Sequence, residues 1–180
     1  MSNNDAIRLA KPLPLPEKID GFSLNRESFE ITSNDPVMKF ANFTSAYKLF
    51  SFYMDKQDSF EIEVISFCDC LGFYKHILAP ISYVFDKNGN NIAQKVVRRT
   101  NGGVGTISLH LSGKAPLAGQ YYLLTAADNS NPGKIVSKEG FSLLGVTYVP
   151  IPTGVSVVNH SNPFGKIVPS YKLNKSIGGK

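Results

Sequence analysis

Tryptophan is missing from this chain of 180 residues, and only two cysteines and three histidines are present. Most of the 8 Tyr and 12 Phe fall on strand faces that are expected to be buried, so exposed aromatic platforms for sugar stacking are not expected. The histidines are scattered, and neither a catalytic triad nor a general acid–base pair can be assembled from them. The sequence therefore offers little material for catalysis or for sugar binding.

Charge is sparse as well, at 18% of the residues, with 19 Lys and Arg against 14 Asp and Glu. The basic excess forms no dense run of the kind that nucleic-acid-binding proteins use, so no nucleic-acid partner is expected. A hydrophobic content of 42% and this length predict one globular domain with its own core. A basic edge is compatible with the positions that hold much of the excess: Lys95, Arg98, Arg99, Lys166, Lys172, Lys175 and Lys180.

No apolar run approaches the roughly 18 residues that would span a bilayer. The start, Met1 to Arg8, has no charged region leading into an apolar one, so no signal peptide is visible. This fits a cytoplasmic protein, and equally an exported protein whose leader or lipoprotein anchor has been removed. Pro12, Pro14 and Pro16 predict an extended segment, either a semi-rigid spacer between an anchor and a domain or a disordered N-terminus.

A sustained helical period is also missing, and alternation of period 2 takes its place. Phe60 to Val64 alternates apolar with acidic residues, which predicts a strand with one buried face. From Ile65 the outer face becomes apolar too, so the end of this strand is expected to be covered on both sides. Ile81 to Phe85 predicts a second strand, and Asn88-Gly89 after it predicts a type I′ hairpin turn, because both residues accept positive φ.

About eight such strands, separated by Gly, Asn and Pro turns, predict an all-β antiparallel sandwich of jelly-roll type with almost no helix. The central strands are expected at Tyr47 to Met54, covered on both sides, and at Phe60 to Cys70. Ile92 to Arg98 is more polar and is expected at an edge. The remaining strands are expected at Phe29 to Ile31, Ile107 to Leu111, Gln120 to Thr125 (inner pair Tyr121 and Leu123 or Tyr122 and Leu124) and Phe141 to Val149.

This pattern divides the chain into a Pro-rich N-terminal segment (residues 1–20), a sandwich (21–150) and a C-terminal tail (151–180). The tail contains only short β-like pieces, at 155–158 and 166–168, among Gly and Pro residues. It is expected to pack on or beside the sandwich.

The hairpin Ser82 to Ala93 and the later stretch Leu117 to Leu124 resemble the pre-peptidase C-terminal sandwich domains, which are secreted modules. With Leu78 to Asp86, the pattern also resembles the maltose-operon periplasmic protein family, whose members are non-enzymatic envelope proteins. The resemblance covers roughly residues 40 to 128 and rests on short, turn-driven motifs. It implies a periplasmic or outer-membrane-anchored protein, with any membrane association made through an anchor not seen in this chain.

Cys68 and Cys70 lie two apart on an expected strand, so their side chains point to one face and a bridge between them would be strained. Two free, buried thiols are therefore expected, with a Cys68–Cys70 bridge as the alternative. His76 could join them as a metal ligand, or act with Cys70 as a nucleophile pair. No second ligand pair, orienting residue or oxyanion donor completes either site, so neither is expected.

Other candidate groups also favour structural interpretations. Glu61 and Glu63 share a face near the spacing of glycosidase carboxylates, but they are expected to be solubility charges on a wet face, as is His110 on its strand. The glycines at 102, 103 and 105 lack the Lys and the strand-to-helix context of a phosphate loop. His160 lies in the Gly- and Pro-rich tail and is given no role.

A calcium loop at Asp86 to Asn90 fails as an EF-hand, because its Gly stands at position 4 and Val97 stands where a bidentate Glu is required. A looser calcium site between this turn and the loop at Asp128 stays open. No catalytic residue, cofactor or metal is expected.

The predicted function is that of a non-enzymatic binding module of the bacterial cell envelope, which contacts another envelope protein through its surface. A carbohydrate-binding or accessory domain of a sugar-uptake or hydrolase system is the first alternative, with a glycan as partner. An inhibitor or immunity-type protein that occludes a partner is the second.

Overall fold

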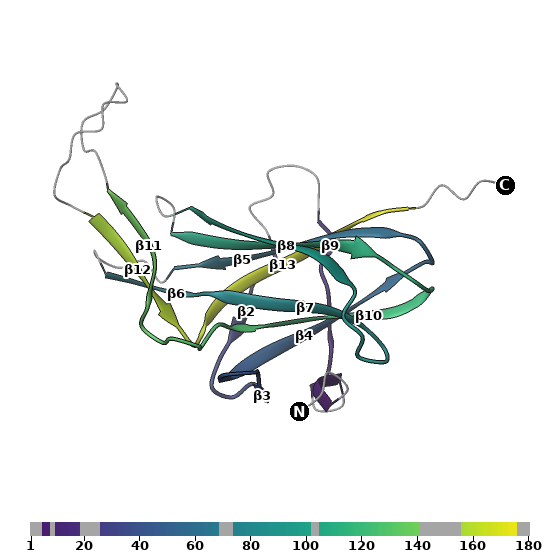
Figure 1. The fold of residues 1–180 in the computed structure, drawn as a ribbon, viewed down its shortest axis with the longest axis horizontal. Helices are drawn as coiled ribbons and strands as arrows, with labels where there is room; N and C mark the ends of the chain where they lie inside the picture. The colour runs from purple at the N-terminus through teal and green to yellow at the C-terminus, as the bar shows by residue number, and fades with distance from the viewer. Residues whose placement is uncertain are drawn as a thin grey trace, which may run out of the picture.

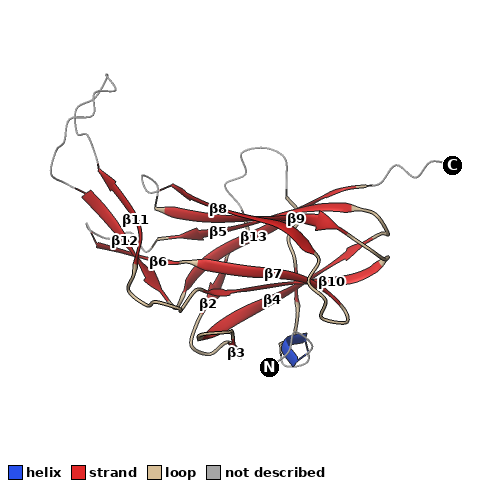
Figure 2. Cartoon of the chain, viewed as in Figure 1, coloured by secondary structure: helices blue, strands red, loops and turns tan. Residues whose placement is uncertain are grey.

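The computed structural model describes residues 5–7, 10–18, 26–68, 74–101, 105–140 and 156–175. Over these ranges the chain forms thirteen strands and a single helical turn at residues 5–7 (Figure 2). The all-β antiparallel sandwich that the sequence predicts is therefore confirmed, with more strands than expected. Within the described ranges, no helix is long and apolar enough to cross a membrane.

The first sheet has the order β1-β4-β10-β7 (Figure 1). Its members are β1 (Leu13–Pro14), β4 (Thr44–Met54), β10 (Gly119–Ala127) and β7 (Pro80–Asp86), and the short β3 (Val37–Lys39) also pairs with β4. β4 pairs with β10 along eight residues, from Gly119↔Met54 to Ala126↔Tyr47. The central position predicted for this strand is confirmed.

The second sheet has the order β2-β13-β5-β9-β8. Its members are β2 (Phe29–Ile31), β13 (Gly165–Asn174), β5 (Ser59–Phe67), β9 (Thr106–Lys114) and β8 (Ala93–Asn101). β5 is central and β8 is an edge strand, as the sequence predicts. A third, smaller sheet of β11 (Ile135–Gly140), β12 (Ser156–Asn162) and β6 (Tyr74–Leu78) lies at one end of the molecule (Figure 1).

The main core fills the space between the two large sheets. Phe50, Phe52 and Met54 of β4 pack there with the alternating apolar residues of β5 and β9. Tyr121 and Leu123 belong to this core, whereas Leu124 faces away from it, which decides between the two inner pairs that the sequence allows. The principal buried members are Phe50, Phe52, Met54, Phe60, Ile62, Val64, Leu109, Leu111, Tyr121 and Leu123.

A second apolar cluster covers the outer face of the first sheet. Tyr47 and Leu49 of β4 pack there against Met38, Phe40 and Ala6, and the Tyr47 hydroxyl donates to the carbonyl of Ala6 at 3.2 Å. β4 is thus covered on both sides over this length, as predicted.

The predicted double cover is wrong at two strand ends. Tyr53, near the end of β4, is 57% exposed, and Phe67, at the end of β5, is 43% exposed. The reason at β4 is that the second cluster contacts Tyr47 and Leu49 but does not include Tyr53. At the end of β5, Phe67 pairs with the polar Thr106 of β9, and the pairing with β13 stops one residue earlier, at Ser66 opposite Ile167.

The Pro-rich segment connects the edges of both large sheets. Leu15 donates its backbone N–H to Ser51 of β4 at 2.9 Å, while Tyr171 of β13 donates to Pro16 at 3.0 Å and accepts from Lys18 at 2.7 Å. Leu15 is buried in the main core. Neither the free spacer nor the disordered N-terminus is correct for residues 10–18, because backbone pairing and leucine burial hold them on the sandwich.

β13 is a strand of ten residues between β2 and β5, not a short piece in a tail beside the sandwich. The sequence did not predict this strand because of Pro169: proline donates no backbone hydrogen bond, and its presence argues against a central strand. Pairing with β2 stops at Ile167, so the nitrogen of Pro169 has no strand to bond on that side. The expected piece at 155–158 corresponds to the start of β12, and the strand expected at Phe141 to Val149 lies outside the described residues.

The turn after β7 is not type I′, because Gly89 has φ of 82° but Asn88 does not have positive φ. The Gly89 amide donates to the Asp86 carbonyl at 3.0 Å, and the Asp86 amide donates to the Asn90 carbonyl at 3.1 Å. This is a three-residue loop with glycine in the left-handed position. Ile92 then donates to Val84 at 2.8 Å before the chain crosses to the second sheet as β8.

Gly89→Val should lower the free energy of unfolding by about 1–3 kcal/mol, because a β-branched residue is strained at positive φ. Urea unfolding followed by circular dichroism measures the change. An unfolding midpoint equal to that of the wild type would contradict the left-handed conformation at Gly89.

Asp86→Asn should destabilise the protein at neutral pH and much less in acid. Burial raises the pKa of the Asp86 carboxyl, but hydrogen bonds from Asn90, Asn88 and Gly89 outweigh it and hold the pKa below its ordinary 3.8. The stabilisation by this carboxylate is therefore present above the unfolded-state pKa and is lost as the pH falls through the lower folded-state pKa. Urea midpoints of both proteins at neutral pH and near pH 3 test this, and an equal difference at both would refute it.

Candidate functional site

The outward side chains of β13, β5, β9 and β8 form a polar surface, here named the charged face. The register places Lys172, Glu61, Ser112 and Lys95 in one row across the four strands. The next row is Ser170, Glu63, His110 and Val97, and the third is Val168, Ile65, Ser108 and Arg99. These residues alternate with the buried core residues of the same strands, so the face is fixed by the strand period.

A groove of about 470 Å³ runs over the charged face. Its lining includes Lys18, Glu61, Glu63, Lys95, Val97, Arg99, His110 and Lys172. No Phe or Tyr of the described residues lines it.

Glu63 lies at the centre of this groove with its side chain 17% exposed. Lys18 Nζ lies 3.0 Å from its carboxylate, His110 Nε2 lies 3.7 Å from it, and Arg26 lies 3.9 Å from it. Lys18 and Arg26 come from the N-terminal part of the chain, which sequence reasoning did not place here. Because these cations are themselves more than a third exposed, each pair contributes little to stability.

The groups around His110 do not form a catalytic triad. Ser108 Oγ lies 3.2 Å from His110 Nε2, and Glu63 Oε1 lies 3.7 Å from the same nitrogen. In a triad the nucleophile and the carboxylate meet opposite ring nitrogens, so that one orients the base while the other gives up a proton. Glu61 is exposed, whereas Glu63 is ion-paired with Lys18 and its side chain is largely shielded.

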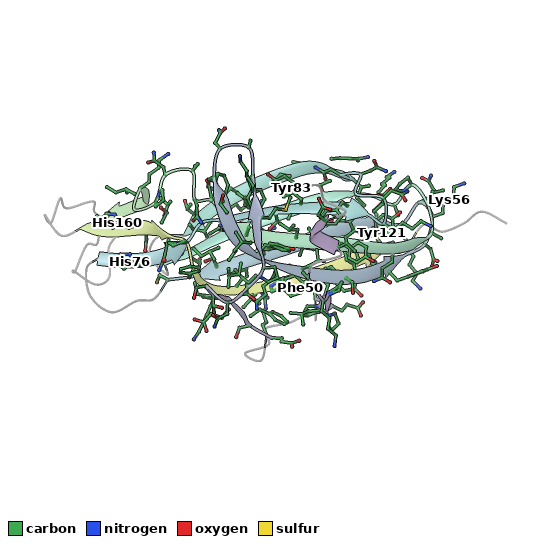
Figure 3. The ribbon with its side chains drawn as sticks, turned by 90° about the horizontal axis from the view of Figure 1, so that it is seen from below. Phe50, Lys56, His76, Tyr83, Tyr121 and His160 are labelled. Atoms are coloured by element: carbon green, nitrogen blue, oxygen red, sulfur yellow. The ribbon has the colours of Figure 1, made fainter. Side chains whose placement is uncertain are left out.

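His76 and His160 are brought together by the parallel pairing of β6 and β12, with ring centroids 6.3 Å apart (Figure 3). No sequence pattern indicates this pair, because the two strands lie far apart along the chain. The His160 Nδ1 contacts the Gly133 carbonyl at 2.9 Å. In the described part of the chain, no group of three or more His, Cys, Asp or Glu could hold a metal ion.

Cys68 is disulfide-bonded, so the predicted free thiols are wrong. The chain has one other cysteine, Cys70, which lies outside the described residues. β5 ends at Phe67, so the strand geometry that disfavours a bond between residues i and i+2 no longer applies at Cys68. A disulfide sulfur is not a thiolate, and this removes Cys68 as a metal ligand or nucleophile beside His76.

Mass spectrometry after alkylation should therefore find no labelled cysteine in protein unfolded without a reductant. After reduction, two labels should appear, because the chain contains two cysteines. Labelling of either residue before reduction would show that the bridge is absent from the protein in solution.

The calcium site proposed between the Asp86 turn and the Asp128 loop is wrong. Asp86 ends β7, whereas Asp128 donates its amide to Ala79 beside the start of that strand. Seven strand residues separate the two carboxylates by roughly 20 Å at about 3.3 Å per residue, too far for one ion. Residues 102–104 of the glycine-rich loop lie outside the described ranges.

Two tyrosines on the first sheet are more exposed than expected. Tyr83 is 39% exposed and stacks on Phe40, with ring centroids 6.1 Å apart, and Phe40 stacks on Phe43 at 5.1 Å. Tyr53 does not belong to this stack and does not line the groove over the charged face.

Comparisons with family models, with curated proteins and with solved structures find no match for this chain. The resemblance to envelope proteins therefore stays a prediction.

Proposed function

We propose that this protein is a non-enzymatic β-sandwich binding module of the bacterial cell envelope, and that it binds another protein through the charged face. The observation that carries the proposal is the groove over β13, β5, β9 and β8, which is lined by charged side chains on rigid strands. Charges on a fixed surface favour specific partners and speed their encounter.

The contacts within the groove support binding rather than catalysis. His110 meets Ser108 and Glu63 through one nitrogen, and Glu63 is engaged by Lys18 and Arg26. Catalysis by such groups requires a base that is oriented on one side and can transfer a proton on the other. The envelope location rests on the sequence resemblance alone.

Site-specific photo-cross-linking tests the proposal. Val97, which lines the groove, is replaced by p-benzoylphenylalanine in the native bacterium, and Val37, an exposed residue of β3 near the first sheet, serves as the matched control position. We expect an adduct with one envelope protein from position 97 and none from position 37. Equal adducts at both positions, no adduct at position 97, or a purely cytoplasmic fraction would overturn the proposal.

A glycan-binding function is the second candidate, and the partly exposed stack of Tyr83 on Phe40 favours it. Affinity electrophoresis in gels that contain a soluble polysaccharide tests it. Retardation that Tyr83→Ala removes, and that Tyr53→Ala preserves, would favour this function over protein binding.

A further inference from the structure

The charged face has a surplus of positive charge. Five Lys and Arg side chains belong to it or contact its carboxylates, against two Glu: Lys18, Arg26, Lys95, Arg99 and Lys172 against Glu61 and Glu63. A ligand that complements this surface must therefore be acidic.

The surplus is unevenly placed. Lys18 and Arg26 engage Glu63, and Lys172 stands opposite Glu61 in the strand register. Lys95 and Arg99 lie on the edge strand β8, are exposed, and have no acidic partner within 4 Å in the described residues. The accessible positive charge thus lies along β8.

The spacing along β8 fits an extended polypeptide. Lys95 and Arg99 are four residues apart on one face of the strand, or about 13 Å at about 3.3 Å per residue. An extended segment laid along β8 has the same rise, so carboxylates four residues apart on one of its faces reach both cations. Arg99 can also bind a carboxylate through two parallel N–H···O bonds.

Two features disfavour other anions. Glu61 and Glu63 lie two strands from β8, about 10 Å away, and would repel the dense phosphates of a nucleic acid crossing the face. Among the described residues, the groove has no Phe or Tyr on which bases could stack. Of its apolar lining residues, Ile62 and Leu111 are buried, and the partly buried Val97 alone is too small an apolar surface to insert into a lipid layer.

We infer that the groove beside β8 binds an extended acidic segment of a partner protein, with Lys95 and Arg99 as the two carboxylate-binding residues. This inference rests on the proposed function and specifies the chemistry of the partner.

Fluorescence anisotropy with a labelled oligoglutamate tests the inference on the full chain. The reversal variant Lys95→Glu/Arg99→Glu is compared with Lys56→Glu/Lys87→Glu, which changes the same net charge at two exposed lysines in turns. We expect the first variant to weaken binding about tenfold or more and the second to weaken it less than about threefold. Circular dichroism checks folding, and Lys95→Gln/Arg99→Gln replaces the reversal variant if that variant does not fold.

Equal effects of the two variants would overturn the inference, because binding would then follow net charge alone. Tighter binding of a single-stranded oligonucleotide, or of phosphatidylglycerol vesicles, than of oligoglutamate would also overturn it. An envelope-protein adduct at position 97 without oligoglutamate binding would refute the acidic segment but leave the proposed function standing. Oligoglutamate binding without that adduct would refute the proposed function, but it would show that the groove accepts an acidic peptide.

Discussion

Phe50→Ala should lower the free energy of unfolding by about 3–5 kcal/mol, the largest loss expected from a single side chain here. Phe50 is completely buried in the core between the two sheets, and its ring packs edge-to-face on Phe29 with centroids 4.9 Å apart. Alanine would lose this contact and leave a cavity that β4, paired on both sides at this position, cannot collapse to fill. Equilibrium unfolding in urea measures the loss.

Tyr53→Ala is the matched control, because Tyr53 lies on the same strand and is largely exposed. Its expected effect is below about 1 kcal/mol. Similar losses of unfolding free energy in the two variants would mean that Phe50 is not buried in the core between the two sheets.

Gly113→Val should cost about 3 kcal/mol, because nothing larger than hydrogen fits on the inner side of Gly113. A Cβ there would lie 2.6 Å from the Ile92 carbonyl oxygen and 2.8 Å from the Phe60 ring. The Ile92 carbonyl belongs to the crossing from β7 to β8, so this backbone cannot move without disturbing both sheets. The thermal unfolding midpoint and the urea midpoint should both fall.

Ser112→Val provides the comparison, since Ser112 is the neighbouring residue and points to the charged face. Its expected change is within about 0.5 kcal/mol, as for other surface substitutions. If the two variants had equal stability, the close approach of Ile92 to Gly113 would be refuted.

Strands with strong alternation of apolar and polar residues could be predicted, because this pattern lies within the strand itself. In β5 and β9 the inner residues are apolar and the outer ones polar, so their faces follow from the sequence alone. β3 and β6 were not predicted, because they are short and their strand conformation depends on pairing with β4 and β12 rather than on a pattern of their own. The local turn at Gly89 was assigned to the wrong type because Asn-Gly is compatible with more than one loop.

The charged face could be predicted only in part. Alternation along β8 places Lys95, Val97 and Arg99 on one side, and alternation along β5 does the same for Glu61 and Glu63. The sequence could not show that these two sets share one face, because β9 lies between them and no short turn links β5 to β9. The contact of Lys18 with Glu63 spans 45 residues and follows from the path of the Pro-rich segment, for which no sequence rule exists.

The position of β13 also bears on how the chain folds as it leaves the ribosome. β13 lies between β2 and β5, and its Tyr171 bonds the Pro-rich segment near the other end of the chain. Until β13 has been synthesised, β2 has no partner strand among the described residues, and β5 has an open edge able to pair with strands of other nascent chains. Completion of the sandwich therefore waits for the synthesis of β13, and a chaperone that shields the β5 edge should raise the yield of folded protein.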